Sequence, residues 1–181
     1  MAATRIVCLG DSITWGFPHG QHCSWVRMLG DDLGIPVINQ GINGDTVGGM
    51  LRRFDHSVLT HNPSHLIVMG GINDVFGGHS YPMITGNLQK IAERAVEHNI
   101  QVVFGTPTAV DYPELERLLW RLRDWIMNYA GDNEMPVIPF HRAFIDDDGE
   151  VKTELLLADG GHPTEAGFTE LYQMIDLSIF R

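Results

Sequence analysis

The chain has 181 residues, of which 44% are hydrophobic and 19% are charged, and its formal net charge is −11 with histidine neutral. These values are typical of one soluble domain with a sizeable core, so we expect a single domain over residues 1–181. The acidic balance disfavours nucleic acid and anionic membrane surfaces as partners, and no apolar run reaches the length of a membrane span.

Strands and helices alternate along the first half of the chain. Apolar runs rich in β-branched residues predict strands at residues 5–9, 36–40 and 65–69. We expect helices around residues 25–33 and 46–54, each after the loop that follows a strand.

The second half of the chain continues the same alternation. Residues 101–104 and 136–139 predict two further short strands. Helical spacing of apolar residues marks three more helices. Their markers are Ile84, Leu88, Ile91 and Ala95, then Leu115, Leu118, Leu119, Leu122, Ile126 and Tyr129, and finally Phe168, Leu171, Ile175 and Ile179. Alternating strands and helices predict an α/β fold with a parallel sheet and helices on both faces.

A serine follows the first predicted strand directly, in Gly10-Asp11-Ser12-Ile13. The carboxyl ends of parallel strands border the ligand crevice of open α/β sheets. A serine hydroxyl there becomes a nucleophile only when a base takes its proton.

His162 is the candidate base among nine histidines, because it alone has a carboxylate, Asp159, three residues earlier. In a tight turn, Asp159 could accept a hydrogen bond from one ring nitrogen and leave the other free. The alternative is an aspartate that caps the next helix and a histidine that is merely structural.

Two further loops supply candidate donors for an oxyanion. Residues 41–45 follow the second predicted strand and residues 70–74 follow the third. The backbone N–H of Gly44 and the side-chain amide of Asn73 are the candidates, because ester hydrolysis needs donors placed for a tetrahedral oxyanion. The alternative is ordinary turn chemistry, which also favours glycine and asparagine.

Four blocks of the chain, in this order, resemble those of the SGNH or GDSL-type hydrolases, a family of esterases, lipases and acylhydrolases. The blocks are Gly10-Asp11-Ser12, Asn39-Gln40-Gly41-Ile42-Asn43-Gly44-Asp45, Gly71-Ile72-Asn73-Asp74, and Asp159 to His162. One position departs from the commoner pattern: Gly161 precedes His162, where the family more often carries an apolar side chain.

The resemblance implies a serine hydrolase that cleaves carboxylic esters or thioesters of short-to-medium acyl groups, with no cofactor and no metal. Ser12, Asp159 and His162 would form the catalytic triad. The oxyanion hole would consist of Ser12, Gly44 and Asn73. The partner is a small-molecule ester or thioester.

The resemblance also implies a flavodoxin-like three-layer α/β/α sandwich. With five parallel strands in the order 2-1-3-4-5, the topological switch point lies between the first and third strands. Ser12, Gly44 and Asn73 would then share one crevice.

Other functions remain open at this point. A carbohydrate acetylesterase or an acyltransferase would use the same site, and a flavodoxin-like nucleotide-binding module without catalysis would leave Asp159 and His162 without a role. An α/β-hydrolase elbow is absent, since Thr14 stands where Gly-x-Ser-x-Gly needs its second glycine.

Aromatic residues close to the serine and asparagine blocks are candidates for a substrate pocket. They are Trp15, Phe17, Phe76 and Tyr81. Farther along the chain, Trp120 and Met127 fall outside the core stripe of their helix, so we expect this face to meet a second subunit or a neighbouring loop.

The expected location is the cytoplasm. The N-terminus shows no signal-peptide pattern, and Cys8 and Cys23 read as free thiols of a reducing compartment. The acidic cluster at residues 146–150 lacks the ligand spacing of a calcium loop and predicts a solvated turn.

Overall fold

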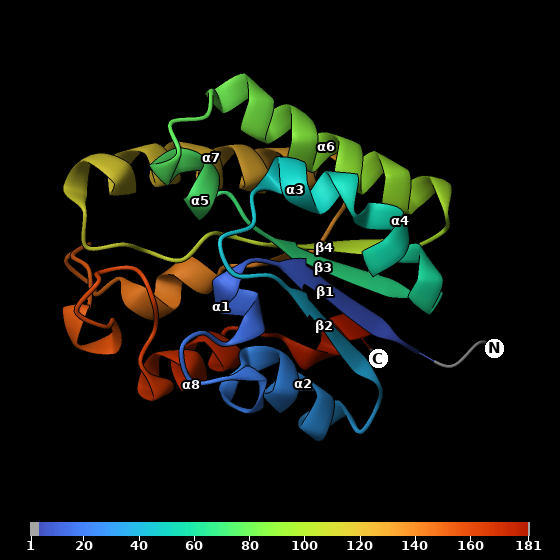
Figure 1. Ribbon diagram of the computed structural model, residues 1–181, viewed down its shortest axis with the longest axis horizontal. Coiled ribbons are helices and arrows are strands. Elements are labelled where there is room, and N and C mark those ends of the chain that lie inside the picture. The colour runs from blue at the N-terminus through green and yellow to red at the C-terminus, as the bar shows by residue number, and fades with distance from the viewer. Residues whose placement is uncertain (1–3, 181) are drawn as a thin grey trace.

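The molecule is built on a five-stranded parallel sheet, shown in the computed structural model, which describes residues 4–180 (Figure 1). The strands lie in the order β2-β1-β3-β4-β5, which confirms the predicted flavodoxin-like order. Their bounds are β1 (Ile6–Gly10), β2 (Val37–Gly41), β3 (His65–Met69), β4 (Gln101–Gly105) and β5 (Val137–Ile138).

Every residue of β1 is buried, because helices cover both faces of the sheet. Burial on both faces explains why this strand reads as a continuous apolar run rather than as an alternating one. The register pairs Gly10 with Gly41 on one side and with Met69 on the other. The first three strands therefore end at the same level, and the loops that follow them emerge together.

Eight α-helices lie in the described part of the chain. They are α1 (Ser12–Trp15), α2 (Trp25–Leu33), α3 (Val47–Arg52), α4 (Phe54–Ser57), α5 (Ile72–Phe76), α6 (Tyr81–Glu97), α7 (Pro113–Asp132) and α8 (Glu165–Gln173). Helices α2 and α8 pack together on one face of the sheet, while α3, α6 and α7 cover the other (Figure 1). This arrangement is the predicted three-layer sandwich.

Hydroxyl side chains cap three of these helices. Ser24 accepts a hydrogen bond from the N–H of Val26 at the start of α2. Thr46 and Thr164 do the same for α3 and α8. Such caps satisfy backbone donors that have no partner within the helix, and they fix where each helix begins.

Several predicted helices end elsewhere than expected. The helix expected over 46–54 is divided at Arg53 into α3 and α4. The last helix stops at Gln173, so Ile175 and Ile179 lie beyond it. Helices α1 and α5 were not predicted, because four or five residues are too few to show helical periodicity.

Leu118 was wrongly assigned to the core stripe of α7, since its side chain is 44% exposed. The buried side of this helix also contains Glu116 and Arg123, which an apolar pattern cannot include. At about 100° per residue, these two polar residues rotate the buried face away from Leu118.

Trp120 lies outside the core face of α7, as predicted, with 41% of its side chain exposed. Its ring contacts that of His141 edge-on, with centroids 5.3 Å apart, so a neighbouring segment covers part of it. The solvated turn at residues 146–150 is also confirmed, since these residues are exposed and bond chiefly among themselves.

Candidate active site

Ser12, His162 and Asp159 form one hydrogen-bonded chain, although 146 residues separate Ser12 from Asp159 in sequence. The Ser12 Oγ lies 2.9 Å from His162 Nε2, and His162 Nδ1 lies 2.6 Å from Asp159 Oδ2. This is the relation of nucleophile, base and orienting carboxylate in a catalytic triad.

Asp159 is fixed by the turn that it begins. Its Oδ1 accepts hydrogen bonds from the backbone N–H groups of Gly161 and His162, each at 3.0 Å. Burial acts to raise the pKa of Asp159, but these N–H groups and the His162 ring together hold that pKa below its ordinary value. The carboxylate therefore stays ionised where the imidazole needs a negative partner. Because Thr164 caps the following helix, Asp159 is not its cap.

The imidazole of His162 is also held by packing. The ring of Phe17 contacts it with centroids 4.8 Å apart, and the nearby His19 Nε2 lies 3.2 Å from the carbonyl oxygen of Pro163. The loop after α1 thus supports the base from the side of the serine.

Asp11 stabilises the loop that carries Ser12. It caps α1 by accepting a hydrogen bond from the N–H of Ile13 at 3.0 Å. Burial raises the pKa of Asp11 to about 6, with the neighbouring Asp45 and Asp74 adding to the rise, while the Ile13 bond and His162 act against it. The close packing here also requires glycine at position 10, where a Cβ would lie 2.0 Å from Thr14 Oγ1.

Asn73 joins the second and third loops. Its Nδ2 donates a hydrogen bond to the carbonyl oxygen of Asp45 at 2.8 Å, which leaves the other amide hydrogen available. Gly44 directly precedes Asp45 and has a φ of +76°, a backbone conformation that favours glycine. The β2 loop that carries Gly44 is therefore tied to the asparagine, and Asp74 strengthens the link by accepting from the N–H of Val47.

Arg53 is a supporting residue that the sequence did not single out. Its guanidinium donates to the carbonyl oxygens of Gly10 at 3.0 Å and Gln40 at 2.9 Å, and to the Asp45 carboxylate at 2.7 Å. One side chain therefore ties the ends of β1 and β2 together. An arginine inside a helical pattern gives no signal of such a role.

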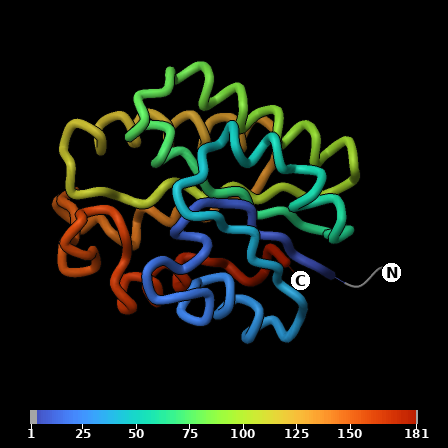
Figure 2. The backbone as a smooth tube through the Cα atoms, viewed as in Figure 1, coloured from blue at the N-terminus to red at the C-terminus, as the bar shows by residue number. Residues whose placement is uncertain are grey.

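Tyr112 is a second residue that no motif revealed. Its hydroxyl donates to the carbonyl oxygen of Asp159 at 2.9 Å, and the N–H of Asp111 donates to that of Gly160 at 2.7 Å. The loop between β4 and α7 thus runs beside the turn of Asp159 at one end of the molecule (Figure 2). These contacts stabilise the turn from Asp159 to His162, to which Gly160 and Gly161 give little rigidity of their own.

A cavity of about 290 Å³ opens on the triad. Ile13, Ile72 and Phe76 form its apolar wall, and Ser12, Asn73 and His162 are among its polar lining residues. The cavity therefore brings the serine, the base and one oxyanion candidate together beside a small apolar surface.

The four aromatic pocket candidates have different outcomes. Phe76 lines the triad cavity, and Phe17 contacts the ring of His162 instead. Tyr81 lines a separate cavity of about 190 Å³ and lies under the guanidinium of Arg121, so the structure does not bring it to the triad cavity. Trp15 is not among the described residues that line the triad cavity. Closeness in sequence to Ser12 or Asn73 did not mean closeness to the cavity: α1 packs on β2, and Tyr81 begins α6.

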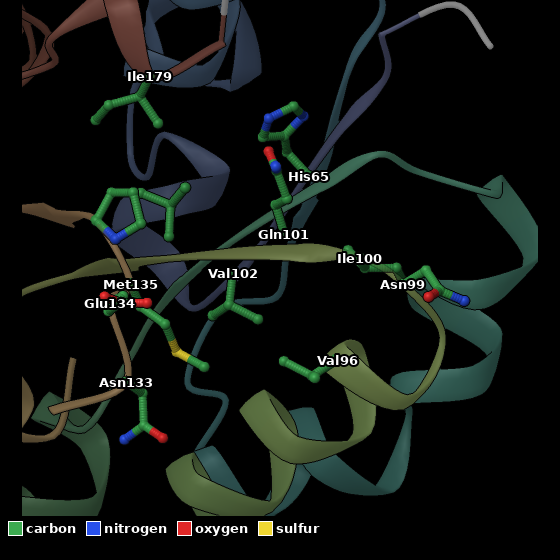
Figure 3. A pocket seen from close by; sticks show the side chains of 12 residues that line it. His65, Val96, Asn99, Ile100, Gln101, Val102, Asn133, Glu134, Met135 and Ile179 are labelled. Atoms are coloured by element: carbon green, nitrogen blue, oxygen red, sulfur yellow. The ribbon is translucent and has the colours of Figure 1, made fainter. Parts of the chain in front are cut away.

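A larger cavity of about 600 Å³ lies at the opposite edge of the sheet (Figure 3). His65 and Gln101, the first residues of β3 and β4, line it together with residues from the ends of α6 and α7. It opens at the amino ends of the strands, so it does not face the triad at their carboxyl ends.

Among residues 4–180, no cluster of three or more His, Cys, Asp or Glu side chains is placed to hold a metal ion. In the same range, no helix combines the length and apolar character needed to cross a bilayer.

The flavodoxin-like sheet and the serine site at its carboxyl edge define an ester hydrolase with a serine, histidine and aspartate triad arrangement. Comparison with known proteins identifies the family: the model of the GDSL-like lipase/acylhydrolase family matches residues 8–169. The chain belongs to this family and is a carboxylic ester hydrolase.

Named relatives agree with this assignment. An arylesterase of Vibrio mimicus is 28% identical over 167 residues, covering 90% of this chain and 81% of the relative. The esterase TesA of Pseudomonas aeruginosa is 25% identical over 181 residues, covering 96% and 87%. The structure of a lipolytic G-D-S-L family protein from Desulfitobacterium hafniense superposes with a TM-score of 0.88 at 24% identity, covering 95% of this chain and 97% of that one.

Proposed function

We propose that the protein hydrolyses carboxylic esters of short-to-medium acyl groups through an acyl-enzyme on Ser12. The observation that carries the proposal is the hydrogen-bonded chain from Ser12 through His162 to Asp159, which opens on a cavity with an apolar wall. Groups in this relation perform acyl transfer on several unrelated folds.

In the first half of the reaction, His162 Nε2 takes the proton of Ser12 as the hydroxyl oxygen attacks the ester carbonyl. Asp159 holds the ring and stabilises its positive charge, since its pKa is lowered and it remains ionised. The tetrahedral intermediate collapses when the imidazolium gives its proton to the alcohol oxygen, which leaves.

In the second half, water repeats the attack on the acyl-enzyme, with His162 again as base, and the carboxylic acid and free Ser12 result. In both tetrahedral intermediates, the oxyanion would accept hydrogen bonds from the N–H groups of Ser12 and Gly44 and from the unused amide hydrogen of Asn73. Each such donor supplies stabilisation that exists only in the transition state.

The volume of the triad cavity supports the proposal of short-to-medium acyl groups. At about 290 Å³, it accommodates a short acyl chain against Ile13, Ile72 and Phe76. We expect acetyl to hexanoyl esters to react faster than dodecanoyl esters.

The test is a series of 4-nitrophenyl esters that vary in chain length, with wild type and Ser12→Ala. Removal of the nucleophile should lower kcat by about 10⁴-fold or more with the fold unchanged. Ester hydrolysis by Ser12→Ala within tenfold of wild type would refute the proposed nucleophile.

Three further expectations stay predictions. Cytoplasmic location is supported by two free thiols, Cys8 and Cys23. A contact between two copies through Trp120 and Met127, both about two-fifths exposed, is supported by the size of these side chains. The net charge supports the absence of a nucleic-acid partner.

A further inference from the structure

Each of the three proposed oxyanion donors has an aspartate as its neighbour in the chain. The pairs are Asp11-Ser12, Gly44-Asp45 and Asn73-Asp74. The three carboxylates lie close enough to act on one another, since Asp45 and Asp74 add to the rise that burial causes in the pKa of Asp11. The negative charge of an oxyanion would therefore be opposed by these side chains unless a positive group offsets them.

The guanidinium of Arg53 lies among the loops that carry these aspartates. Its Nε lies 2.7 Å from Asp45 Oδ2, and the two side chains are only 15% and 13% exposed. Ion pairs that are largely removed from water are screened little by salt. Arg53 therefore offsets the charge of the aspartate that directly follows Gly44.

The same guanidinium joins the loop of the serine to the loop of the glycine. Its Nη2 donates to the carbonyl oxygen of Gly10 at 3.0 Å, and the N–H of Ile42 donates to that oxygen at 3.1 Å. Gly10 lies two residues before Ser12, and Ile42 lies two residues before Gly44. The relative position of these two donors therefore depends on a junction to which Arg53 contributes.

The third donor is connected to Arg53 through Asp45. The Asn73 Nδ2 donates to the carbonyl oxygen of Asp45 at 2.8 Å, so the backbone of Asp45 orients the amide. One carboxylate oxygen of Asp45 packs against α3, where a Cβ at Gly49 would lie 1.8 Å from it. The other oxygen is the one that Arg53 binds. Both oxygens of Asp45 are thus held in place.

We propose that Arg53 is the positioning residue of the oxyanion hole: it fixes the three donors relative to one another and offsets the charge of Asp45. It is not a catalytic residue, because its contacts are to backbone carbonyls, to Asp45 and to Ser57 rather than to the reacting atoms. This inference rests on the proposed function, since it states how the proposed donors are held.

The test measures kcat and KM for 4-nitrophenyl acetate in Arg53→Met at a temperature well below its Tm. The kcat should fall about tenfold to a hundredfold while KM stays within about twofold, because displaced donors weaken only the transition state. Arg53→Lys keeps the charge but lacks the planar fork, so it should recover part of kcat. It also serves as the second variant if Arg53→Met folds poorly. Arg52→Met is the matched control: this neighbouring arginine is exposed, so kcat and KM should match wild type.

A double-mutant cycle with Asn73→Ala separates positioning of the donors from support of the fold. Once the amide is gone, Arg53→Met has one donor fewer to displace, so its cost should shrink to about threefold or less. An equal fold-loss in both backgrounds overturns the inference. A rise in KM alone also overturns it, as does a fall in Tm while kcat stays within about twofold of wild type. A failure of the proposed function looks different, since Ser12→Ala would then hydrolyse the same ester.

Discussion

Replacing Arg123 by methionine should destabilise the protein strongly, because this guanidinium is buried and fully engaged. Its side chain is 1% exposed. It forms an ion pair with Glu116, and it donates to the carbonyl oxygens of Pro107 at 2.8 Å and Thr108 at 2.7 Å. Methionine preserves most of the volume but none of these hydrogen bonds.

The expected cost follows from what the substitution leaves behind. Glu116 would remain a buried carboxylate whose other contact is the N–H of Val110, at 3.0 Å. Removal of one partner of a buried ion pair typically costs 3–5 kcal/mol. With an unfolding entropy of about 2.1 cal/mol/K per residue, this corresponds to a fall in Tm of about 8–13 °C.

Urea unfolding followed by circular dichroism measures the loss, with Arg117→Met as the control. Arg117 is exposed on the same helix, so its replacement should change the free energy of unfolding by less than about 0.5 kcal/mol. The double variant Arg123→Met/Glu116→Leu removes both charges and should recover most of the stability. If Arg123→Met lowered the free energy of unfolding by less than about 1 kcal/mol, the buried charge would not be what stabilises the loop of Pro107 and Thr108.

Three further predictions concern the site itself. Asn73→Ala should lower kcat by roughly 10²–10³-fold with little change in KM, because an oxyanion donor acts in the transition state. Steady-state assays measure both constants, and a change in KM alone would count against this role. Tyr112→Phe should lower kcat about threefold to tenfold while KM and Tm stay close to wild type, since it removes one hydrogen bond to the turn of Asp159; a wild-type kcat would show that the turn needs no anchor. Asp11→Asn should change the pH dependence of stability. The folded protein keeps the Asp11 proton up to a pKa of about 6, whereas the unfolded chain releases it near 3.8. The stability of wild type relative to Asp11→Asn should therefore fall as pH rises from about 4 to 6 and stay constant above, which urea titrations across that range can test.

The sequence predicted the parts of the site that rest on local rules. Ser12 follows a strand whose burial on both faces is visible as an apolar run, and Asn73 follows a second such strand. Asp159 and His162 are three residues apart, so their hydrogen bond needs only a turn. Parallel strands then bring Ser12 and Asn73 to one edge, because the carboxyl ends of β1 and β3 coincide.

Other parts of the site depend on contacts that no local pattern records. Tyr81 is near Asn73 in sequence but lines a separate cavity, while Tyr112 is 47 residues from Asp159 in sequence and donates a hydrogen bond to its carbonyl oxygen. Arg53 lies between α3 and α4 and Arg123 within α7, and neither gives a sequence signal of its role. Arg53 donates to the carbonyl oxygen of Gly10 at the end of β1, and Arg123 donates to that of Thr108 in the loop after β4.

The sequence by itself determined where the strands lie along the chain, that a serine follows the first of them, and that Asp159 and His162 share a turn. It could do so because burial and turn chemistry act over a few residues. Only the tertiary structure decided which side chains wall the cavities, how α7 is rotated around its buried ion pair, and which loop supports Asp159. The physical reason is that a polar group can be buried wherever a distant partner satisfies it, and that partner is known only once the chain has folded.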